Sequence, residues 1–346
     1  MTNIYYLSER FENPNFGGVK ARDDIDVILK SKKFTPIPIQ FCFYNPKSLI
    51  GLIKIIKKGL SNWHTIKSQA EKGSIIFIQY PFGNTSLNTL ELRKTRKSHG
   101  FRFVAFIHDI ESLQTDSSSK VKELELLKLF DMVICHNTCM QRQLINLGIS
   151  KNNIVVLHLF DYLTNTCPRK NRSINEGLVI AGNLASFKAA YIYKLISTSE
   201  IPVILYGTNF DERYSDKVNY MGSLPADLLI GEIKGSFGLV WDGDSLNECN
   251  GSFGEYQKIN NPHRVSMYLT AQIPIFIWNK AALRDFVVDN NLGFGIDRLD
   301  DIPEILSELT EDRYQSMVQS TQSISQKLRN GYFTSRAIDE TISKLK

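Results

Sequence analysis

Polar and charged side chains are concentrated in the stretch YQKINNPHR, which runs from 256 to 264 and leads into an amphipathic segment. Pro262 suits the first turn of a helix, and unpaired N–H groups at a helix start attract anions. A purely structural turn would not need an amide pair, an imidazole and two cations. The stretch therefore predicts an anion site, as for a diphosphate, formed by Arg264 and the first N–H groups of the helix.

Glycines next to small polar residues end several apolar runs in the second half of the chain. Asn183 and Lys188 lie in AGNLASFK (181–188), where Ser186 or Lys188 could meet a phosphate at a helix start. The stretches LYGTNF (205–210) and MGSLP (221–225) each end a run with glycine and a hydroxyl residue, and Asp242 follows another run. One such loop is ordinary turn chemistry, but three in succession on one sheet predict the wall of a nucleotide pocket.

Another glycine-containing loop, NPNFGGVKARDD (13–24), follows the first apolar run of the chain. Gly17 and Gly18 would let the backbone approach a ligand closely, and Lys20 and Arg22 add positive charge beside a helix start. The alternative is a flexible loop before a helix. The loop is neither a GxGxxG fingerprint nor a GxxxxGK[ST] motif, which disfavours NAD and P-loop ATP chemistry.

His108 and Asp109 follow the apolar run in FRFVAFIHD (101–109), so they should emerge at the carboxyl end of a strand. Either group could take a proton from an acceptor hydroxyl. Alternatively, Asp109 caps the next helix and His108 packs in an interface. Cys135, His136 and Cys139 together with His108 could suggest a zinc site, but no second ligand pair has metal-site spacing, so no metal site is predicted.

The elements that position these residues are short apolar runs separated by helical stretches. Such runs are typical of strands that are buried on both faces of a parallel sheet, which predicts doubly wound α/β domains. In the first half the runs are 3–8, 36–43, 74–81, 101–109, 132–137 and 154–161, and in the second half they are 178–183, 202–207, 219–223, 237–244 and 274–278. The polar stretch 164–177 separates the two series. We therefore expect domains at 1–170 and 171–325 and a C-terminal helix at 326–346, with ligands at the carboxyl ends of both sheets.

The composition suits a globular protein with two cores, since 42% of the 346 residues are apolar and 22% are charged. Five cysteines without a CxxC spacing, and a start without a signal-like apolar stretch, predict a reduced, cytoplasmic setting. The net charge of +5 comes without a basic stripe interleaved with aromatic residues, which makes nucleic-acid binding improbable. No apolar run reaches the roughly 18 to 20 residues that a membrane span needs.

Lysines and apolar residues alternate in 47–67, KSLIGLIKIIKKGLSNWHTIK. Such a segment could lie on an anionic membrane surface, with Trp63 at the level of the headgroups. The alternative is an ordinary surface helix whose stripe, from Leu49 to Trp63, packs on a sheet.

The motifs KARDD, IHDIESL, FDYL (160–163), AGNLASFK, GLVWDGDS and NNPHR occur in an order that resembles bacterial β-1,6-galactofuranosyltransferases of O-antigen and polysaccharide synthesis. More distantly, they resemble the glucosyltransferases that extend GlcNAc on adhesins. The resemblance implies a GT-B fold: two Rossmann-like domains that face a cleft, and a last helix that crosses back to the N-terminal domain. It implies an N-terminal acceptor domain, a C-terminal domain that binds a UDP-sugar, and no obligatory metal or other cofactor. The family pattern ends in NNPHK, so Arg264 replaces an ammonium with a guanidinium that can grip two oxygens.

The resemblance also assigns roles to residues. Asn260, Asn261, His263 and Arg264 would hold the diphosphate with help from Lys258, and Tyr206, Gly207 and Gly222 would border the uracil and ribose. The residues that would close over the donor from the other domain are Gly17, Gly18, Lys20 and Arg22. We expect transfer of galactofuranose from UDP-Galf to a sugar hydroxyl, with Asp109 as base and His108 or Asp161 as alternatives.

The acceptor would be a lipid-linked glycan at the cytoplasmic face of the inner membrane, and a homo-oligomer is compatible with this interpretation. Two other hypotheses remain open. One is a glucosyl- or galactopyranosyltransferase that uses UDP-glucose or UDP-galactose and acts on a glycan or glycoprotein. The other is a non-catalytic subunit that binds nucleotide sugars.

Overall fold

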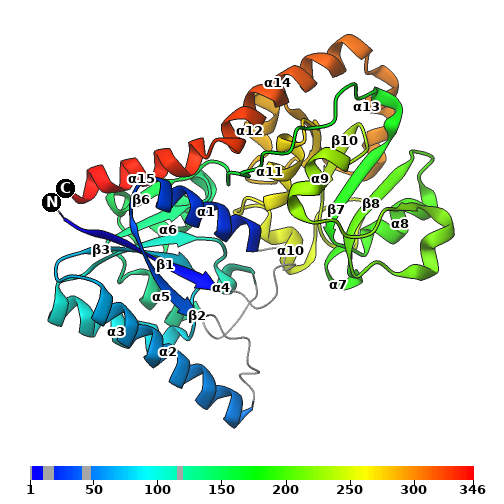
Figure 1. The fold of residues 1–346 in the computed structure, drawn as a ribbon. Coiled ribbons are helices and arrows are strands. Elements are labelled where there is room, and N and C mark those ends of the chain that lie inside the picture. Colours follow the sequence, from blue (N-terminus) through cyan, green and yellow to red (C-terminus); the bar gives the residue numbers. More distant parts are fainter. Residues whose placement is uncertain (1, 11–18, 41–47, 115–119) are drawn as a thin grey trace. The chain divides into compact units, whose positions relative to one another are not determined.

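The computed structural model describes residues 2–10, 19–40, 48–114 and 120–346. The chain divides into two compact units. Unit 1 consists of Met1–His158 and Thr334–Lys346, and unit 2 consists of Leu159–Phe333. Each unit is built around one sheet of parallel strands (Figure 1).

Unit 1 contains a parallel sheet in the order β2-β1-β3-β4-β5-β6. Its strands are β1 (Ile4–Arg10), β2 (Thr35–Gln40), β3 (Ile75–Tyr80), β4 (Arg102–Ile107), β5 (Met132–Cys135) and β6 (Ile154–Val156). The helices are α1 (Val19–Ser31), α2 (Leu49–Gln69), α3 (Thr85–His99), α4 (Glu111–Gln114), α5 (Lys120–Leu127), α6 (Thr138–Asn146) and α15 (Tyr332–Leu345), whose first two residues belong to unit 2.

The helices of unit 1 cover both faces of this sheet. Alternate strand residues, such as Ile76 and Ile78, form one core cluster with Trp63 of α2 and Leu92 of α3, because successive strand residues point to opposite faces. The tail of the chain lies beside α1, where Lys32 pairs with Asp339 of α15 at 2.7 Å (Figure 1). Strands covered on both sides in this way read as continuous apolar runs.

Unit 2 repeats the plan with a parallel sheet in the order β12-β11-β10-β7-β8-β9. Its strands are β7 (Leu178–Asn183), β8 (Val203–Thr208), β9 (Asn219–Tyr220), β10 (Phe237–Val240), β11 (Ile275–Trp278) and β12 (Gly293–Ile296). The helices are α7 (Ser186–Ala189), α8 (Tyr191–Thr198), α9 (Ala226–Glu232), α10 (Gly251–Tyr256), α11 (His263–Thr270), α12 (Arg284–Asp289), α13 (Ile302–Glu308) and α14 (Glu311–Arg329).

The predicted fold class is confirmed, and every predicted apolar run overlaps a strand. Strand β12 was not predicted, because its sequence GFGI is half glycine and lacks an apolar run. The remaining difference is in the boundaries between the units.

Unit 2 begins at Leu159 rather than at 171. The segment after His158 has little regular structure, but its backbone bonds to helices of unit 2: Ser266 donates to Phe160 O at 2.6 Å, and Tyr162 N donates to Leu328 O at 3.2 Å. At the other end the chain returns to unit 1 at Thr334 rather than at 326. The last turns of α14 stay with unit 2, where Ser325 donates to Thr270 O at 2.8 Å.

Candidate functional site

Each sheet has one point where its strand order reverses. In unit 2, β7 and β10 are neighbours; the strand that follows β7 in sequence lies on one side of this pair and the strand that follows β10 lies on the other. In unit 1 the same holds for β1 and β3. In open α/β sheets, ligands bind outside the carboxyl ends of the strands at such a point. Both points carry clusters of polar side chains.

In unit 2 the cluster is centred on Asp242, two residues after β10. Its Oδ2 atom accepts hydrogen bonds from Arg264 and, at 2.8 Å, from Nε2 of Gln257. Asp242 and Gln257 are both buried. Within the described residues, Asp242 Oδ1, Gln257 Oε1 and Arg264 Nε have no hydrogen-bond partner. Buried polar atoms without a protein partner are unusual in a folded protein, so this cluster is a candidate ligand site.

Arg264 is held in this cluster by charge. Burial alone would lower the pKa of its guanidinium, but the Asp242 carboxylate and the Tyr191 hydroxyl more than offset that effect, so the pKa is raised. Arg264 is therefore a permanent cation that is already paired within unit 2. The sequence predicted this residue as an anion ligand and gave no sign of the pairing with Asp242.

The start of α11 lies next to that pair, since Pro262 is its N-cap and makes no side-chain cap bond. Asn261 is buried at this turn, and Asn260 is half-buried. His263 stacks on Tyr162 with ring centroids 5.3 Å apart. The N–H groups of the first turn thus lack a side-chain cap, which is the arrangement that an anion-binding helix start requires.

Lys258 is engaged nearby. Its Nζ lies 2.5 Å from Glu255 and 5.4 Å from the centre of the Trp278 ring. Both side chains of this ion pair are exposed to solvent, so breaking it costs little free energy. Lys258 can therefore still turn toward an anion.

The predicted glycines join the ends of β7, β8 and β9. Gly207 N donates to Gly222 O at 2.9 Å, and a Cβ on Gly207 would lie 1.8 Å from Gly182 O. Asn183 accepts from Ala185 N at 3.1 Å, which shapes the turn into α7. Lys188 belongs to α7, and its Nζ atom lies 5.2 Å from the centre of the Phe253 ring.

Tyr206 is placed differently from its neighbours. Its ring is buried, and its hydroxyl bonds to the backbone of Glu232 and Lys234. Tyr206 and Gly207 were both expected to border the uracil and ribose. Gly207 lies at the carboxyl end of β8, whereas the Tyr206 ring lies in the core.

In unit 1, a buried ion pair occupies the reversal point between β1 and β3. Arg22 of α1 donates to Glu9 of β1 at 2.5 Å and to the carbonyl of Pro81, just after β3, at 2.9 Å. Burial raises the pKa of Glu9 to about 7, against the opposing effect of the Arg22 charge. The hydrogen bonds described for Arg22, to Glu9 and to the carbonyl of Pro81, both lie within unit 1.

A chain of hydrogen bonds extends from this pair to His108. Ser8 donates to Asp26 at 2.6 Å, and Nε2 of Gln79 donates to Asp26 at 2.8 Å and to the carbonyl of Arg22 at 3.1 Å. The Oε1 atom of Gln79 lies 2.7 Å from Nε2 of His108. Burial raises the pKa of Asp26 to about 6. Raised carboxyl pKa values and an oriented imidazole are features of sites that move protons.

The other predicted residues of unit 1 are less engaged with this chain. Asp109 is half-buried directly after His108, and Lys20 pairs with Asp24 within α1 at 2.8 Å. Gly17 and Gly18 lie outside the described residues. Asp161 is buried in unit 2, where it accepts from Phe333 N at 3.2 Å.

The thiols and His136 show no metal-binding arrangement. Burial lowers the pKa of His136 to about 4 and raises that of Cys135 to about 12, so both are neutral core groups near pH 7. In the part of the chain that the structure describes, no group of three or more His, Cys, Asp and Glu side chains could hold a metal ion.

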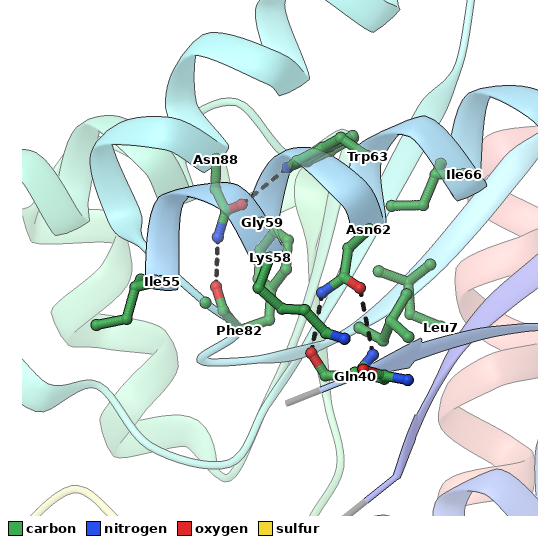
Figure 2. Close-up of a pocket in the computed structure, with 12 residues that line it drawn as sticks. Leu7, Gln40, Ile55, Lys58, Gly59, Asn62, Trp63, Ile66, Phe82 and Asn88 are labelled. Carbon is green, nitrogen blue, oxygen red and sulfur yellow. Dashed lines mark hydrogen bonds between the residues drawn. The ribbon is translucent and has the colours of Figure 1, made fainter. Parts of the chain in front are cut away.

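Figure 2 shows a pocket of unit 1 that contains none of these polar residues. It lies beneath α2, between that helix and residues such as Leu7, Ile39 and Phe82. Asn62 spans its rim through two hydrogen bonds to the backbone of Gln40.

Sequence reasoning missed four residues of these clusters: Glu9, Asp26, Gln79 and Gln257. A signal was present for Gln79, which is a polar residue next to last in the otherwise apolar strand IIFIQY. Buried amides and carboxylates need partners, so such a residue marks a polar cluster at the strand end. Asp26 and Gln257 lie in helical or turn sequence, where polar residues are ordinary.

Comparisons with known proteins agree with this architecture. The model "Glucosyltransferase 3-like, N-terminal domain" matches residues 4–159, and "Glucosyltransferase 3-like, C-terminal domain" matches 178–341. The β-1,6-galactofuranosyltransferase WbbI of Escherichia coli is 31% identical over 99% of this chain and 99% of its own length. Glucosyltransferase 3 of Streptococcus gordonii is 25% identical over 100% of this chain and 98% of its own.

Among solved structures, HepE from Anabaena in complex with UDP superimposes with a TM-score of 0.60 at 14% identity, covering 99% of this chain and 100% of that chain. This likeness shows the fold, two Rossmann-like domains of the GT-B class. The two family models, one for each half of the chain, and the end-to-end similarity to WbbI confirm the resemblance that the motifs indicated. The chain belongs to the glucosyltransferase 3-like family of glycosyltransferases.

Proposed function

We propose that this protein transfers galactofuranose from UDP-Galf to a hydroxyl group of a sugar acceptor during synthesis of a cell-surface polysaccharide. The choice of donor is supported by WbbI, a β-1,6-galactofuranosyltransferase that is similar from end to end. UDP as the carrier is supported by HepE, a structural neighbour that holds UDP.

The observation that carries the donor site is the start of α11 beside the Asp242–Arg264 pair. Because Asp242 offsets the Arg264 charge, the diphosphate would be held chiefly by first-turn N–H groups, with Arg264 fixing the turn from within. Asn260, Asn261 and His263 lie on the same turn, and Lys258 and Lys188 would supply charge from beside it. Such groups stabilise a departing UDP electrostatically, so the proposal requires no metal ion.

Transfer would form a bond between the acceptor oxygen and the anomeric carbon while the bond from that carbon to the diphosphate breaks. UDP leaves with the bonding electrons, and the acceptor proton passes to a base if the reaction inverts. We place this base at the end of β4, on Asp109 or His108, since both follow that strand and His108 is oriented by Gln79. Asp161 is a weaker candidate, because it already accepts a backbone N–H.

Donor screening tests the proposal. Purified protein is incubated with an acceptor glycan and UDP-Galf, UDP-glucose or UDP-galactose, with and without EDTA. Preferred use of UDP-Galf that persists in EDTA is the expected result. Preference for UDP-glucose or UDP-galactose would favour the second candidate, which the similarity to glucosyltransferase 3 supports.

The base is tested separately with Asp109→Asn and His108→Asn. We expect one of the two variants to lose turnover while UDP binding is kept, since general-base catalysis is typically worth about a hundredfold or more. Unchanged turnover in both would exclude the end of β4 as the source of the base. If the wild-type protein binds UDP-sugars but transfers none of them, it is a non-catalytic binding subunit.

A further inference from the structure

Four apolar side chains line an exposed face of α2. Leu49, Ile53, Ile56 and Leu60 have exposed fractions of 74%, 45%, 38% and 47%. They are spaced by four, three and four residues, which places them in one row along the helix. Rows of exposed apolar residues of this kind mark interaction surfaces more often than scattered single residues do.

This row is not the face that packs on unit 1. Trp63 and Ile66 are buried, and the Trp63 indole donates to Asn88 of α3 at 2.9 Å. Ile55, Gly59 and Asn62 face the pocket beneath the helix (Figure 2). The prediction that the stripe packs on the sheet is therefore right for Trp63 and wrong for Leu49, Ile53, Ile56 and Leu60, and Trp63 is not available to lipid headgroups.

The charged side chains of α2 itself are all positive. The helix Leu49–Gln69 has lysines at 54, 57, 58 and 67 and no Asp or Glu. Lys54 and Lys57 are exposed, and Lys58 is half-buried. On a helical projection these three lysines lie on the side of the apolar row that faces away from α3. An apolar row with lysines along one border suits an anionic lipid surface, since apolar side chains enter the acyl boundary while lysines reach the headgroups.

The position of α2 connects this surface to the polar cluster of unit 1. Helix α2 follows β2, so its first turns lie at the carboxyl edge of the sheet, the edge that carries Glu9, Gln79 and His108. The most exposed apolar side chains of α2 are Leu49, which begins the row, and its neighbour Ile50, and both belong to those first turns.

We propose that the exposed face of α2, formed by Leu49, Ile53, Ile56 and Leu60 with Lys54 and Lys57, docks unit 1 on an anionic phospholipid bilayer. The contact is peripheral: among the described helices, none is long and apolar enough to cross a membrane. A second copy of the chain is a poorer occupant. An antiparallel two-fold contact along the row would place the lysine borders of the two chains side by side. This proposal does not depend on which sugar the protein transfers.

Vesicle sedimentation tests the proposal with the full chain. Wild-type protein is mixed with vesicles of phosphatidylethanolamine and phosphatidylglycerol, or with vesicles of phosphatidylcholine alone. We expect binding to the anionic vesicles only, with a loss at high salt because the lysine contribution is screened. Ile53→Glu with Leu60→Glu should abolish binding, and Lys57→Glu should weaken it at least about fivefold.

Matched controls are available in unit 2. Leu228→Glu replaces another exposed leucine, and Lys217→Glu replaces another exposed lysine, so both should bind vesicles as the wild type does. Thermal denaturation shows that each variant is folded, and sedimentation velocity gives its oligomeric state. Equal binding by the Ile53→Glu, Leu60→Glu variant and the wild type overturns the proposal. Failure of the wild-type protein to bind anionic vesicles also overturns it. If the wild type self-associates and the Ile53→Glu, Leu60→Glu variant does not, a second copy of the chain covers the row instead of a bilayer.

Discussion

Gln79 and His108 are joined by a hydrogen bond of 2.7 Å whose direction the surroundings define. The amide nitrogen of Gln79 already donates to Asp26 and to the carbonyl of Arg22, so its oxygen is left as an acceptor. Neutral His108 must then carry its proton on Nε2, which makes Nδ1 the nitrogen that can accept a proton. Gln79 therefore acts as a positioning residue for the imidazole.

Replacing Gln79 with Leu should lower kcat by about tenfold or more while leaving the KM for the donor little changed. The leucine removes the acceptor of the Nε2 proton, so His108 can adopt the other tautomer and turn away. Steady-state kinetics over a range of pH measures the effect. Gln69→Leu, at the exposed end of α2, is the control.

The same comparison in a His108→Asn background distinguishes positioning from a general structural effect. If Gln79 acts through His108, its replacement there should cost little more. A further tenfold loss would show that Gln79 acts in another way.

Glu9 should make the protein less stable as the pH rises from about 4.5 to about 7. Its pKa is 4.5 in an unfolded chain and about 7 in the folded protein, where burial penalises the charge. Between these values the folded state keeps a proton that the unfolded state has lost. The free energy of unfolding therefore falls by up to about 1.4 kcal/mol per pH unit from this group.

Urea denaturation at several pH values measures that slope. Glu9→Gln should flatten it in this window, whereas Glu125→Gln, on the exposed face of α5, should not. A Glu9→Gln variant with the wild-type slope would mean that Glu9 is ionised throughout.

Arg264→Ala should destabilise unit 2 by about 3 kcal/mol or more, because it leaves the buried Asp242 carboxylate without its cation. Arg298→Ala is a suitable control, since its ion pair with Asp301 is largely exposed and should be worth less than about 1 kcal/mol. Chemical denaturation gives both values.

UDP binding by the same variant separates two roles of Arg264. If Arg264 fixes the start of α11 from within, Asp242→Asn should weaken UDP binding as well, although it removes no cation. If Arg264 contacts the diphosphate directly, Asp242→Asn should leave UDP binding intact or strengthen it. Tight UDP binding by Arg264→Ala would contradict both roles.

The strands and the α11 turn could be predicted from sequence because their signals are local. Apolar runs and a polar helix start appear within a few neighbouring residues, as in YQKINNPHR. The pairing of Arg264 with Asp242 could not be predicted in this way, because 22 residues separate the two and only the strand order brings them together. The same holds for Gln79 and His108, which are 29 residues apart.

The 47–67 segment shows a different limit. Its composition indicated a surface helix with apolar residues, but which of them are buried depends on how the helix is rotated on the sheet. Trp63 proved to be the buried anchor and Leu49 the exposed end. Periodicity shows which residues share a face of a helix, but it does not show which part of an apolar face becomes buried in the core.

Strands β7 and β8 approach each other closely at Gly207. Gly207 and Gly182 have similar backbone angles, φ 141° and 134°, which are unfavourable for other residues. A Cβ at Gly207 would also lie 1.8 Å from Gly182 O, whereas a Cβ at Gly182 meets nothing within 4 Å. Both alanine variants should lose about 1 to 3 kcal/mol through backbone strain, and Gly207→Ala should lose about 2 kcal/mol more through the clash. Denaturation of the two variants side by side measures the difference, and equal losses would mean that the strand ends separate at no cost.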